Sequence, residues 1–294
     1  MKAPHGVLTA IATPFDRHGE LALDLVPGLL ELQSRAGMSG VVVAGTNGEG
    51  PSLSVEERIR LLDTVVANRR DLVVVAGTGA ASVTDAVRLA RHACEAGADA
   101  LLVLPPFFFK GVTTDGLAAY FERVLEASSV PVLLYSIPQV SAIAISHELL
   151  DRLAAHPRLL GLKDSSGDWE GMRGFLERGD VQVFAGSDDL LARAFRAGAA
   201  GAISGTANAA PELVAAVLNA WRDGGDLDAA QERLDAARRV LIRYPMLAAN
   251  KSVLAHRGLG RMSVRPPLVD LSPEAEAELL AQFAPVAGWS ADGG

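Results

Sequence analysis

The sequence predicts a (β/α)8 barrel, the TIM-barrel fold, with a C-terminal helical extension. Short β-rich runs alternate with longer helix-like segments from the start of the chain to about residue 220, which is typical of a parallel sheet with helical crossovers. Several runs, such as 41–43 and 73–75, are uniformly apolar, as expected of strands buried on both faces. Residues 211–283 show helical patterns only.

Eight runs account for the strands of such a barrel. The predicted strands cover residues 6–12, 40–45, 72–77, 98–104, 131–135, 159–163, 181–186 and 201–204. The intervening helices carry start motifs, such as the capping box of Ser54 and Glu57. The last helix is predicted to begin at Ser272-Pro273-Glu274, where a cap, a first-turn proline and an acidic side chain coincide.

The predicted division of the chain places the barrel with its active site in residues 1–224 and the helical extension in residues 225–294. The extension could instead be a small separate domain, although residues 205–226 contain nothing typical of a flexible linker. A doubly wound open sheet is the alternative fold. Against it, no Gly-x-Gly-x-x-Gly follows the first predicted strand, and the glycine-rich stretch 45–50 lacks the lysine of a P-loop.

Composition limits the kinds of partner. The net charge is -8, so the chain offers no basic surface typical of nucleic-acid or anionic-membrane binding. No apolar run reaches the roughly 18–20 residues of a membrane-spanning helix, and the first residues lack the apolar core of a signal peptide. We expect a soluble cytoplasmic protein that binds a small molecule or another copy of itself. The single cysteine, Cys94, lies in a helical pattern and is expected to be unreactive.

In barrels of this kind the active site forms where the strands end at their carboxyl side. Polar residues at these positions of the predicted strands, or just after them, are Thr46, Asn47, Glu49, Tyr135, Lys163, Asp164, Ser165 and Ser204. None of the six histidines ends a predicted strand, and they show no metal-ligand spacing. The pattern therefore does not favour a metal-dependent aldolase or hydrolase, and we expect no cofactor.

Lys163 is the candidate nucleophile. It ends an apolar run, and one interpretation is that its amine merely reaches solvent from the end of the strand. The other is that the amine is enclosed by apolar walls, which favours its neutral, nucleophilic form. Such an amine can form a Schiff base with a ketone, and the protonated imine is an electron sink for making or breaking C–C bonds.

Tyr135 and the loop 45–50 complete the candidate site. Tyr135 ends the neighbouring predicted strand, so its hydroxyl either packs in the core with a partner or transfers protons at the same rim. Glycines beside Thr46 and Asn47 would let backbone N–H groups face a carboxylate near a helix start, although a simple polar turn is the alternative. Glu49 is predicted to steady this loop rather than to react.

Five segments in order resemble one known family. They are AIATPF at 10–15, GTNGE at 45–49, LYSIP at 134–138, GLKDSSGD at 161–168 and AGSDD at 185–189. Together they resemble the dihydrodipicolinate synthase and N-acetylneuraminate lyase family of class I, pyruvate-dependent aldolases, across nearly the whole chain.

The resemblance implies a role for each candidate residue. Lys163 would form the Schiff base with pyruvate or another 2-keto acid, and Tyr135 would transfer protons. Thr46 and Asn47 would hold the carboxylate, and Ile203 would pack on the bound pyruvyl group. Because the family usually forms tetramers built from dimers, the resemblance also implies a homo-oligomer, either dimer or tetramer.

Two departures from the synthases favour an aldolase. The synthases supply a tyrosine to a neighbouring subunit from a loop that here reads Phe107-Phe108-Phe109, and a phenyl ring cannot relay a proton. Where the synthases bind the second substrate with an arginine, this chain has Val140. Residues 45–54, 135–138 and 163–168 also resemble the aldolase branches of the family. This resemblance implies that the substrate is 4-hydroxy-2-oxoglutarate or a 2-keto-3-deoxy sugar acid. The alternatives are a 4-hydroxy-tetrahydrodipicolinate synthase, which joins pyruvate to aspartate semialdehyde, and a non-catalytic 2-keto-acid-binding protein.

Overall fold

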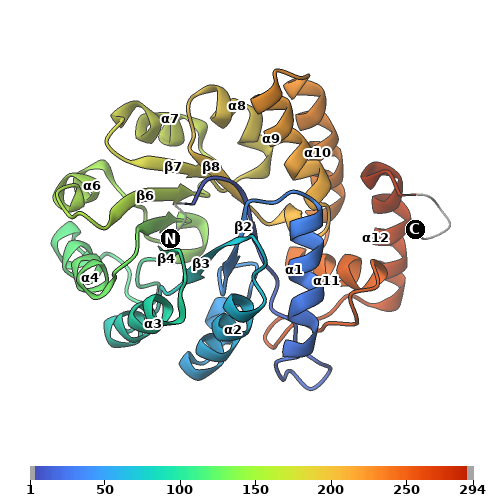
Figure 1. Ribbon diagram of the computed structural model, residues 1–294, viewed down its shortest axis with the longest axis horizontal. Coiled ribbons are helices and arrows are strands. Elements are labelled where there is room, and N and C mark those ends of the chain that lie inside the picture. Colours follow the sequence, from blue (N-terminus) through green and yellow to red (C-terminus); the bar gives the residue numbers. More distant parts are fainter. Residues whose placement is uncertain (1–3, 290–294) are drawn as a thin grey trace.

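The computed structural model describes residues 4–289 and contains a closed barrel of eight parallel strands surrounded by helices (Figure 1). The strands follow one another in chain order around the barrel, and β8 pairs with β1. Closure removes both sheet edges, so the open doubly wound sheet is ruled out and the predicted (β/α)8 fold is confirmed.

Each predicted run contains one strand. The strands are β1 Gly6–Ala10, β2 Gly40–Val43, β3 Val73–Gly77, β4 Ala100–Val103, β5 Val132–Ser136, β6 Leu159–Asp164, β7 Gln182–Ala185 and β8 Gly201–Ser204. Several predicted runs continue past the observed strand end, as at 11–12 and 44–45. These extra residues belong to the loops at the carboxyl rim, whose composition resembles that of the strands they follow.

The helices lie outside the barrel. Every named element after β8 is a helix. The α-helices are α1 Val26–Arg35, α2 Val55–Ala67, α3 Val83–Ala96, α4 Thr114–Ala127, α5 Pro138–Ser141, α6 His147–Leu153, α7 Trp169–Arg178, α8 Leu191–Arg196, α9 Pro211–Asp223, α10 Leu227–Leu241, α11 Met246–His256 and α12 Pro273–Ala287. The predicted capping box at the start of α2 is present, with Ser54 and Glu57 each bonded to the other's backbone N–H.

The C-terminal helices cover one side of the barrel. α10 packs on α9 and on α12 (Figure 1). The predicted boundary at residue 224 falls in the turn between α9 and α10, where Gly224 adopts the left-handed conformation that ends α9. The division into 1–224 and 225–294 remains a prediction.

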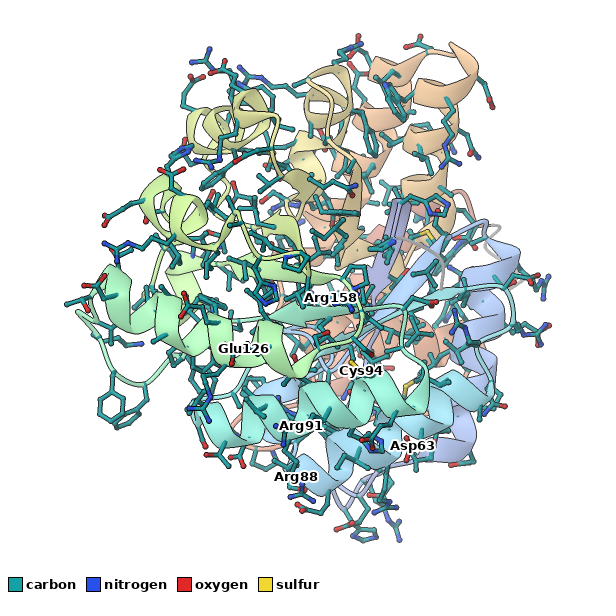
Figure 2. All side chains as sticks on the ribbon, turned by 60° about the vertical axis from the view of Figure 1, so that its left-hand side comes forward. Asp63, Arg88, Arg91, Cys94, Glu126 and Arg158 are labelled. Atoms are coloured by element: carbon teal, nitrogen blue, oxygen red, sulfur yellow. The ribbon has the colours of Figure 1, made fainter. Side chains whose placement is uncertain are left out.

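Cys94 lies on α3, as its sequence context predicts (Figure 2). Its sulfur accepts a hydrogen bond from the N–H of Ser129, just after α4, at 3.3 Å. Among residues 4–289, none of the helices is both long enough and apolar enough to cross a membrane.

Apolar side chains fill the interior of the barrel, as in other barrels of this size. This interior cluster is distinct from the larger outer cluster between strands and helices. Its fully buried members are Leu8, Ala10, Val42, Val73, Val75, Ala100, Leu102, Leu133, Tyr135, Ile137, Phe184 and Ile203. Two of the predicted site residues, Tyr135 and Ile203, therefore belong to the inside of the barrel.

A bulge in β6 sets the direction of the lysine near its end. The pairing of β6 with β5 shifts by one residue next to Gly161. Leu160 packs with the interior cluster, whereas Leu162 packs with the outer cluster. Because side chains alternate between the two faces of a strand, the bulge turns Lys163 inwards, where an unbroken strand would turn it towards the helices.

We expect Gly161→Ala to lower the free energy of unfolding by about 3 kcal/mol or more. A Cβ at this position would lie 1.8 Å from the carbonyl oxygen of Gln182 on β7, so the bulge and its neighbour strand would have to separate. Urea unfolding measures the change. The matched control is Gly116→Ala on α4, an exposed position where the nearest atom would be 3.4 Å away. Equal losses in the two variants would contradict the tight packing of the bulge.

Candidate active site

Lys163 and Tyr135 face each other inside the rim of the barrel. They are paired in register on β6 and β5, and the Lys163 amine lies 4.3 Å from the centre of the Tyr135 ring. Both residues are nearly inaccessible, at 3% and 4% exposed. The amine is therefore enclosed beside a phenol, and the interpretation in which Lys163 reaches solvent is wrong.

Thr46 joins this pair from the loop after β2. Its Oγ1 lies 3.2 Å from the Tyr135 hydroxyl, and either oxygen can donate the hydrogen bond. Burial by itself would raise the pKa of Tyr135, but the positive charge of Lys163, with the hydroxyls of Thr46 and Ser165, lowers it below its usual value. A phenol with a lowered pKa exchanges protons more readily near neutral pH.

Gly186, just after β7, leaves room for the lysine stem. A Cβ at this position would lie 2.8 Å from Cε of Lys163 and 1.9 Å from the hydroxyl oxygen of Ser165. The N–H of Gly186 donates to the Asp164 carbonyl at 2.7 Å, which fixes the two loops together. A glycine here allows β6 and β7 to approach closely enough to enclose the amine.

The loop after β2 brings Asn47 to the other side of the site. The Asn47 amide lies against Gly205 after β8, where an added Cβ would be 2.7 Å from its nitrogen. Its Oδ1 is buried and has no hydrogen-bond partner among the described residues. Thr13 donates its hydroxyl proton to the Gly48 carbonyl at 2.5 Å and so anchors the loop to the segment after β1. An unpaired buried acceptor is costly unless a ligand or water completes it.

Three other candidates have mainly structural contacts. Glu49 is 2% exposed, and its carboxylate accepts hydrogen bonds from Lys251 and from the backbone N–H of Arg265. It steadies the loop, as predicted. Ser204 accepts a hydrogen bond from the N–H of Ala207 at 3.0 Å. Asp164 accepts from the N–H of Ser166 at 2.9 Å, and burial raises the pKa of its carboxyl.

Asp188 lies at the same rim, in the segment after β7, and the strand-end analysis did not select it. It is 5% exposed, and one carboxylate oxygen accepts a hydrogen bond from the N–H of Thr206 after β8 at 3.1 Å. The other oxygen is buried without a partner among the described residues, as is the Thr206 hydroxyl. The segment AGSDD follows the seventh predicted strand, so the rule of strand ends could have found it. Metal-ligand clusters of three or more His, Cys, Asp or Glu residues do not occur within residues 4–289.

Comparison with known proteins shows the family of this chain. Residues 3–284 match the model of the dihydrodipicolinate synthetase family. The chain belongs to this family. It is therefore a carbon–carbon lyase of the class I aldolase type, as the sequence predicted.

Family members differ in name and activity. The chain is 42% identical to an uncharacterized DapA-like lyase of Chloroflexus aurantiacus over 96% of this chain and 97% of that protein. It is 36% identical to the 4-hydroxy-tetrahydrodipicolinate synthase of Phenylobacterium zucineum, over 94% of this chain and 95% of that one.

Two solved structures of family members superpose closely. YagE of E. coli, solved in complex with pyruvate, has a TM-score of 0.92 at 25% identity and covers 97% of this chain and 99% of its own. The sialic acid aldolase of Ruminococcus gnavus has a TM-score of 0.91 at 28% identity and covers 97% of both chains.

We expect Tyr135 to be the first of the three tyrosines to lose its proton as the pH rises. Its pKa is lowered, whereas burial raises the pKa of Tyr120 to about 12 and also raises that of Tyr244. Phenolate absorbance, titrated from about pH 7 to about pH 12, should show a first step that Tyr135→Phe removes.

Lys163→Met is the second arm of this titration. The substitution removes the positive charge that lowers the pKa of Tyr135 and leaves its burial in place, so the first step should move to higher pH. A first step that persists in Tyr135→Phe would contradict the assignment.

Proposed function

We propose that the protein makes or breaks a C–C bond between pyruvate and an aldehyde through a Schiff base on Lys163. The observation that carries the proposal is the enclosed Lys163 amine, 4.3 Å from the Tyr135 ring in a barrel that belongs to this family. Further support comes from a family member, YagE, that was solved in complex with pyruvate. The chemistry needs no cofactor.

In the cleavage direction, the Lys163 amine attacks C2 of a 4-hydroxy-2-keto acid, and the carbonyl oxygen leaves as water. Tyr135 gives its proton to the departing oxygen and then, as the phenolate, accepts the proton of the 4-hydroxyl group, either directly or through Thr46, which lies 3.2 Å from its oxygen. The C3–C4 electron pair moves into the protonated imine, and the aldehyde departs. Protonation of the enamine at C3 and hydrolysis then release pyruvate and restore the amine.

The substrate carboxylate would lie in the loop after β2. Thr46 and Asn47 have their side chains beside the lysine–tyrosine pair and beside Gly205 respectively. Ile203 is 1% exposed within the interior cluster that also contains Tyr135, so it would form the apolar floor under the pyruvyl methyl group.

The substrate that we propose is 4-hydroxy-2-oxoglutarate or a 2-keto-3-deoxy sugar acid. Asn47, Asp188 and Thr206 present buried acceptor oxygens without a partner within residues 4–289, and substrate hydroxyl groups are suitable donors for them. The similarity to a sialic acid aldolase supports a hydroxylated substrate.

Synthase activity is the second candidate, because a relative at 36% identity is a 4-hydroxy-tetrahydrodipicolinate synthase. Against it stand three exposed apolar side chains at the rim. Val140 is 59% exposed and offers no cation for a second carboxylate, and Phe108 and Phe109 lack the hydroxyl of a proton relay. Lys110 ties their loop to the next one by donating to the Ser141 carbonyl at 2.9 Å. We also propose a dimer or tetramer, because Phe108 and Phe109 expose two large apolar rings that a neighbouring subunit would cover.

The imine is tested by borohydride reduction in the presence of pyruvate. We expect a stable pyruvyl mass on the peptide that contains Lys163 and none in Lys163→Met. Tyr135→Phe should retain the adduct at saturating pyruvate but lose roughly 100-fold or more in turnover, because proton transfer is removed while the nucleophile remains. An adduct on another lysine, or none, would refute the mechanism.

Substrate class is tested by comparing kcat/KM across a panel. Pyruvate release from 4-hydroxy-2-oxoglutarate and from 2-keto-3-deoxy sugar acids should exceed the condensation of pyruvate with aspartate semialdehyde by about tenfold or more. Faster condensation would make the protein a synthase. Pyruvate binding with no turnover of any compound would favour the non-catalytic keto-acid-binding alternative.

A further inference from the structure

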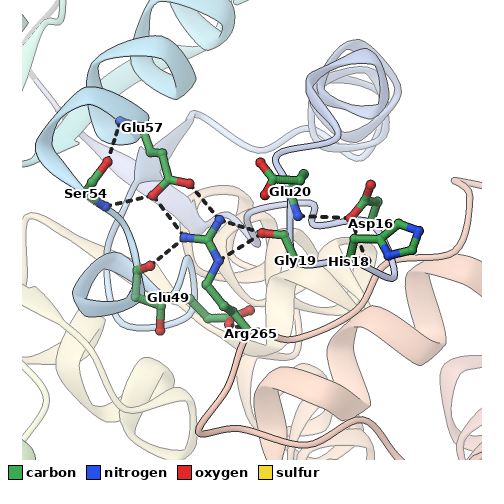
Figure 3. A network of polar contacts seen from close by, with 9 residues as sticks. Asp16, His18, Gly19, Glu20, Glu49, Ser54, Glu57 and Arg265 are labelled. Atoms are coloured by element: carbon green, nitrogen blue, oxygen red, sulfur yellow. Dashed lines mark hydrogen bonds and ion pairs between the residues drawn. The ribbon is translucent and has the colours of Figure 1, made fainter.

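The segment that follows the barrel reaches back to the loop after β2. Lys251 on α11 and Arg265, which follows α11, both contact this loop or the start of the helix after it (Figure 3 shows the Arg265 part). We call these two residues the C-terminal clasp. Within the described residues, neither clasp residue forms a hydrogen bond or an ion pair with Lys163 or Tyr135. Both contact Glu49, and any effect on the site therefore passes through this residue.

Glu49 holds an unusual backbone conformation. Its φ is 52°, in the left-handed region that residues with a Cβ seldom adopt. Its side chain is fully buried and forms an ion pair with Lys251, and its second oxygen accepts the Arg265 N–H at 3.0 Å. A strained conformation persists where surrounding contacts determine it, and these two contacts come from the C-terminal clasp.

Lys251 is 1% exposed, so its amine depends on protein groups rather than water for hydrogen bonds. Besides Glu49, its amine donates to the Ser263 carbonyl at 2.6 Å and lies 4.6 Å from the centre of the Phe15 ring. A buried ion pair adds little net stability compared with apolar side chains of the same size, but it fixes geometry because either charge alone would be costly. This argues for a role in positioning.

Arg265 connects its own segment, after α11, with the segments after β1 and β2. Its guanidinium donates to both carboxylate oxygens of Glu57 at 2.9 and 2.7 Å and to the Ser52 carbonyl at 2.6 Å, all after β2. It also donates to the Gly19 carbonyl, after β1, at 3.0 and 2.6 Å (Figure 3). The planar fork of an arginine can satisfy these acceptors together, whereas a lysine ammonium cannot.

The loop fixed in this way carries the groups that would bind the substrate carboxylate. Thr46 and Asn47 come three and two residues before Glu49, respectively, and the Glu49 N–H donates to the Thr46 carbonyl at 3.1 Å, which closes the turn. We propose that Lys251 and Arg265 are positioning residues for 2-keto-acid binding, which they support by holding Glu49 and with it Thr46 and Asn47. This inference rests on the proposed function of the site.

The kinetic consequence separates binding from chemistry. Loosening the loop should weaken capture of the carboxylate and leave the Lys163 amine and its phenol in place. The concentration of pyruvate that half-saturates imine formation should therefore rise, whereas the rate at saturating pyruvate should change little.

Arg265→Lys tests the clasp in the full chain, because this side chain is only partly buried and keeps its charge. We expect the half-saturating pyruvate concentration for borohydride capture to rise roughly 10-fold, which corresponds to the loss of one good charge-assisted hydrogen bond. The saturated capture rate should stay within about 3-fold. Hydrogen exchange of a peptide covering residues 45–53 should become faster.

Arg257→Lys is the matched control. Arg257 also lies after the barrel and also pairs with a glutamate, Glu212, and its guanidinium donates to the Ala209 carbonyl at 2.9 Å. Its exposed side-chain fraction is 17%, against 19% for Arg265. It makes no hydrogen bond to the loop after β2, so it should change neither capture nor loop exchange.

The double variant Glu49→Gln/Lys251→Met tests the buried half of the clasp without leaving one charge unpaired. It should raise the half-saturating concentration as Arg265→Lys does. The inference is overturned if the half-saturating pyruvate concentration for borohydride capture is unchanged in both Arg265→Lys and the double variant. It is also overturned if this concentration rises equally in Arg257→Lys. Absence of capture in the unaltered protein would instead show that the proposed function fails, and the inference would fall with it.

Discussion

The contact between an enclosed lysine amine and a phenol determines how the rest of the site is arranged. Lys163 faces Tyr135 only because the bulge at Gly161 changes the alternation of β6. Gly186 leaves the space in which the lysine stem lies, and Thr46 reaches the phenol from the loop after β2. The bulge in β6, the glycine after β7 and the loop after β2 therefore all position this one pair of side chains.

Much of this could be predicted from local sequence. Short β-rich runs located all eight strands, and polar residues at their ends located Lys163, Tyr135 and Thr46. The bulge could not be found in this way, because it depends on how β6 pairs with β5 and not on the composition of either strand. The predicted ends of the first two strands were too late, since the residues at 11–12 and 44–45 are as apolar as the strands but belong to rim loops.

Contacts between distant segments were the least predictable part of the site. Lys251 occurs in a helical pattern where a lysine ordinarily faces solvent, yet it is buried against Glu49, 202 residues earlier in the chain. Asp188 follows β7 closely enough for the strand-end rule to select it, but only the fold brings its carboxylate to Thr206.

The order in which these segments are synthesised gives the C-terminal clasp a further meaning. All eight strands and the residues around the amine precede residue 205, and α11 is synthesised after them. The turn at Glu49 acquires its partners only when the last fifth of the chain arrives. A molecule that lost this part of the chain would leave the Glu49 carboxylate without both partners, so the order of the loop after β2 depends on the last residues to be synthesised.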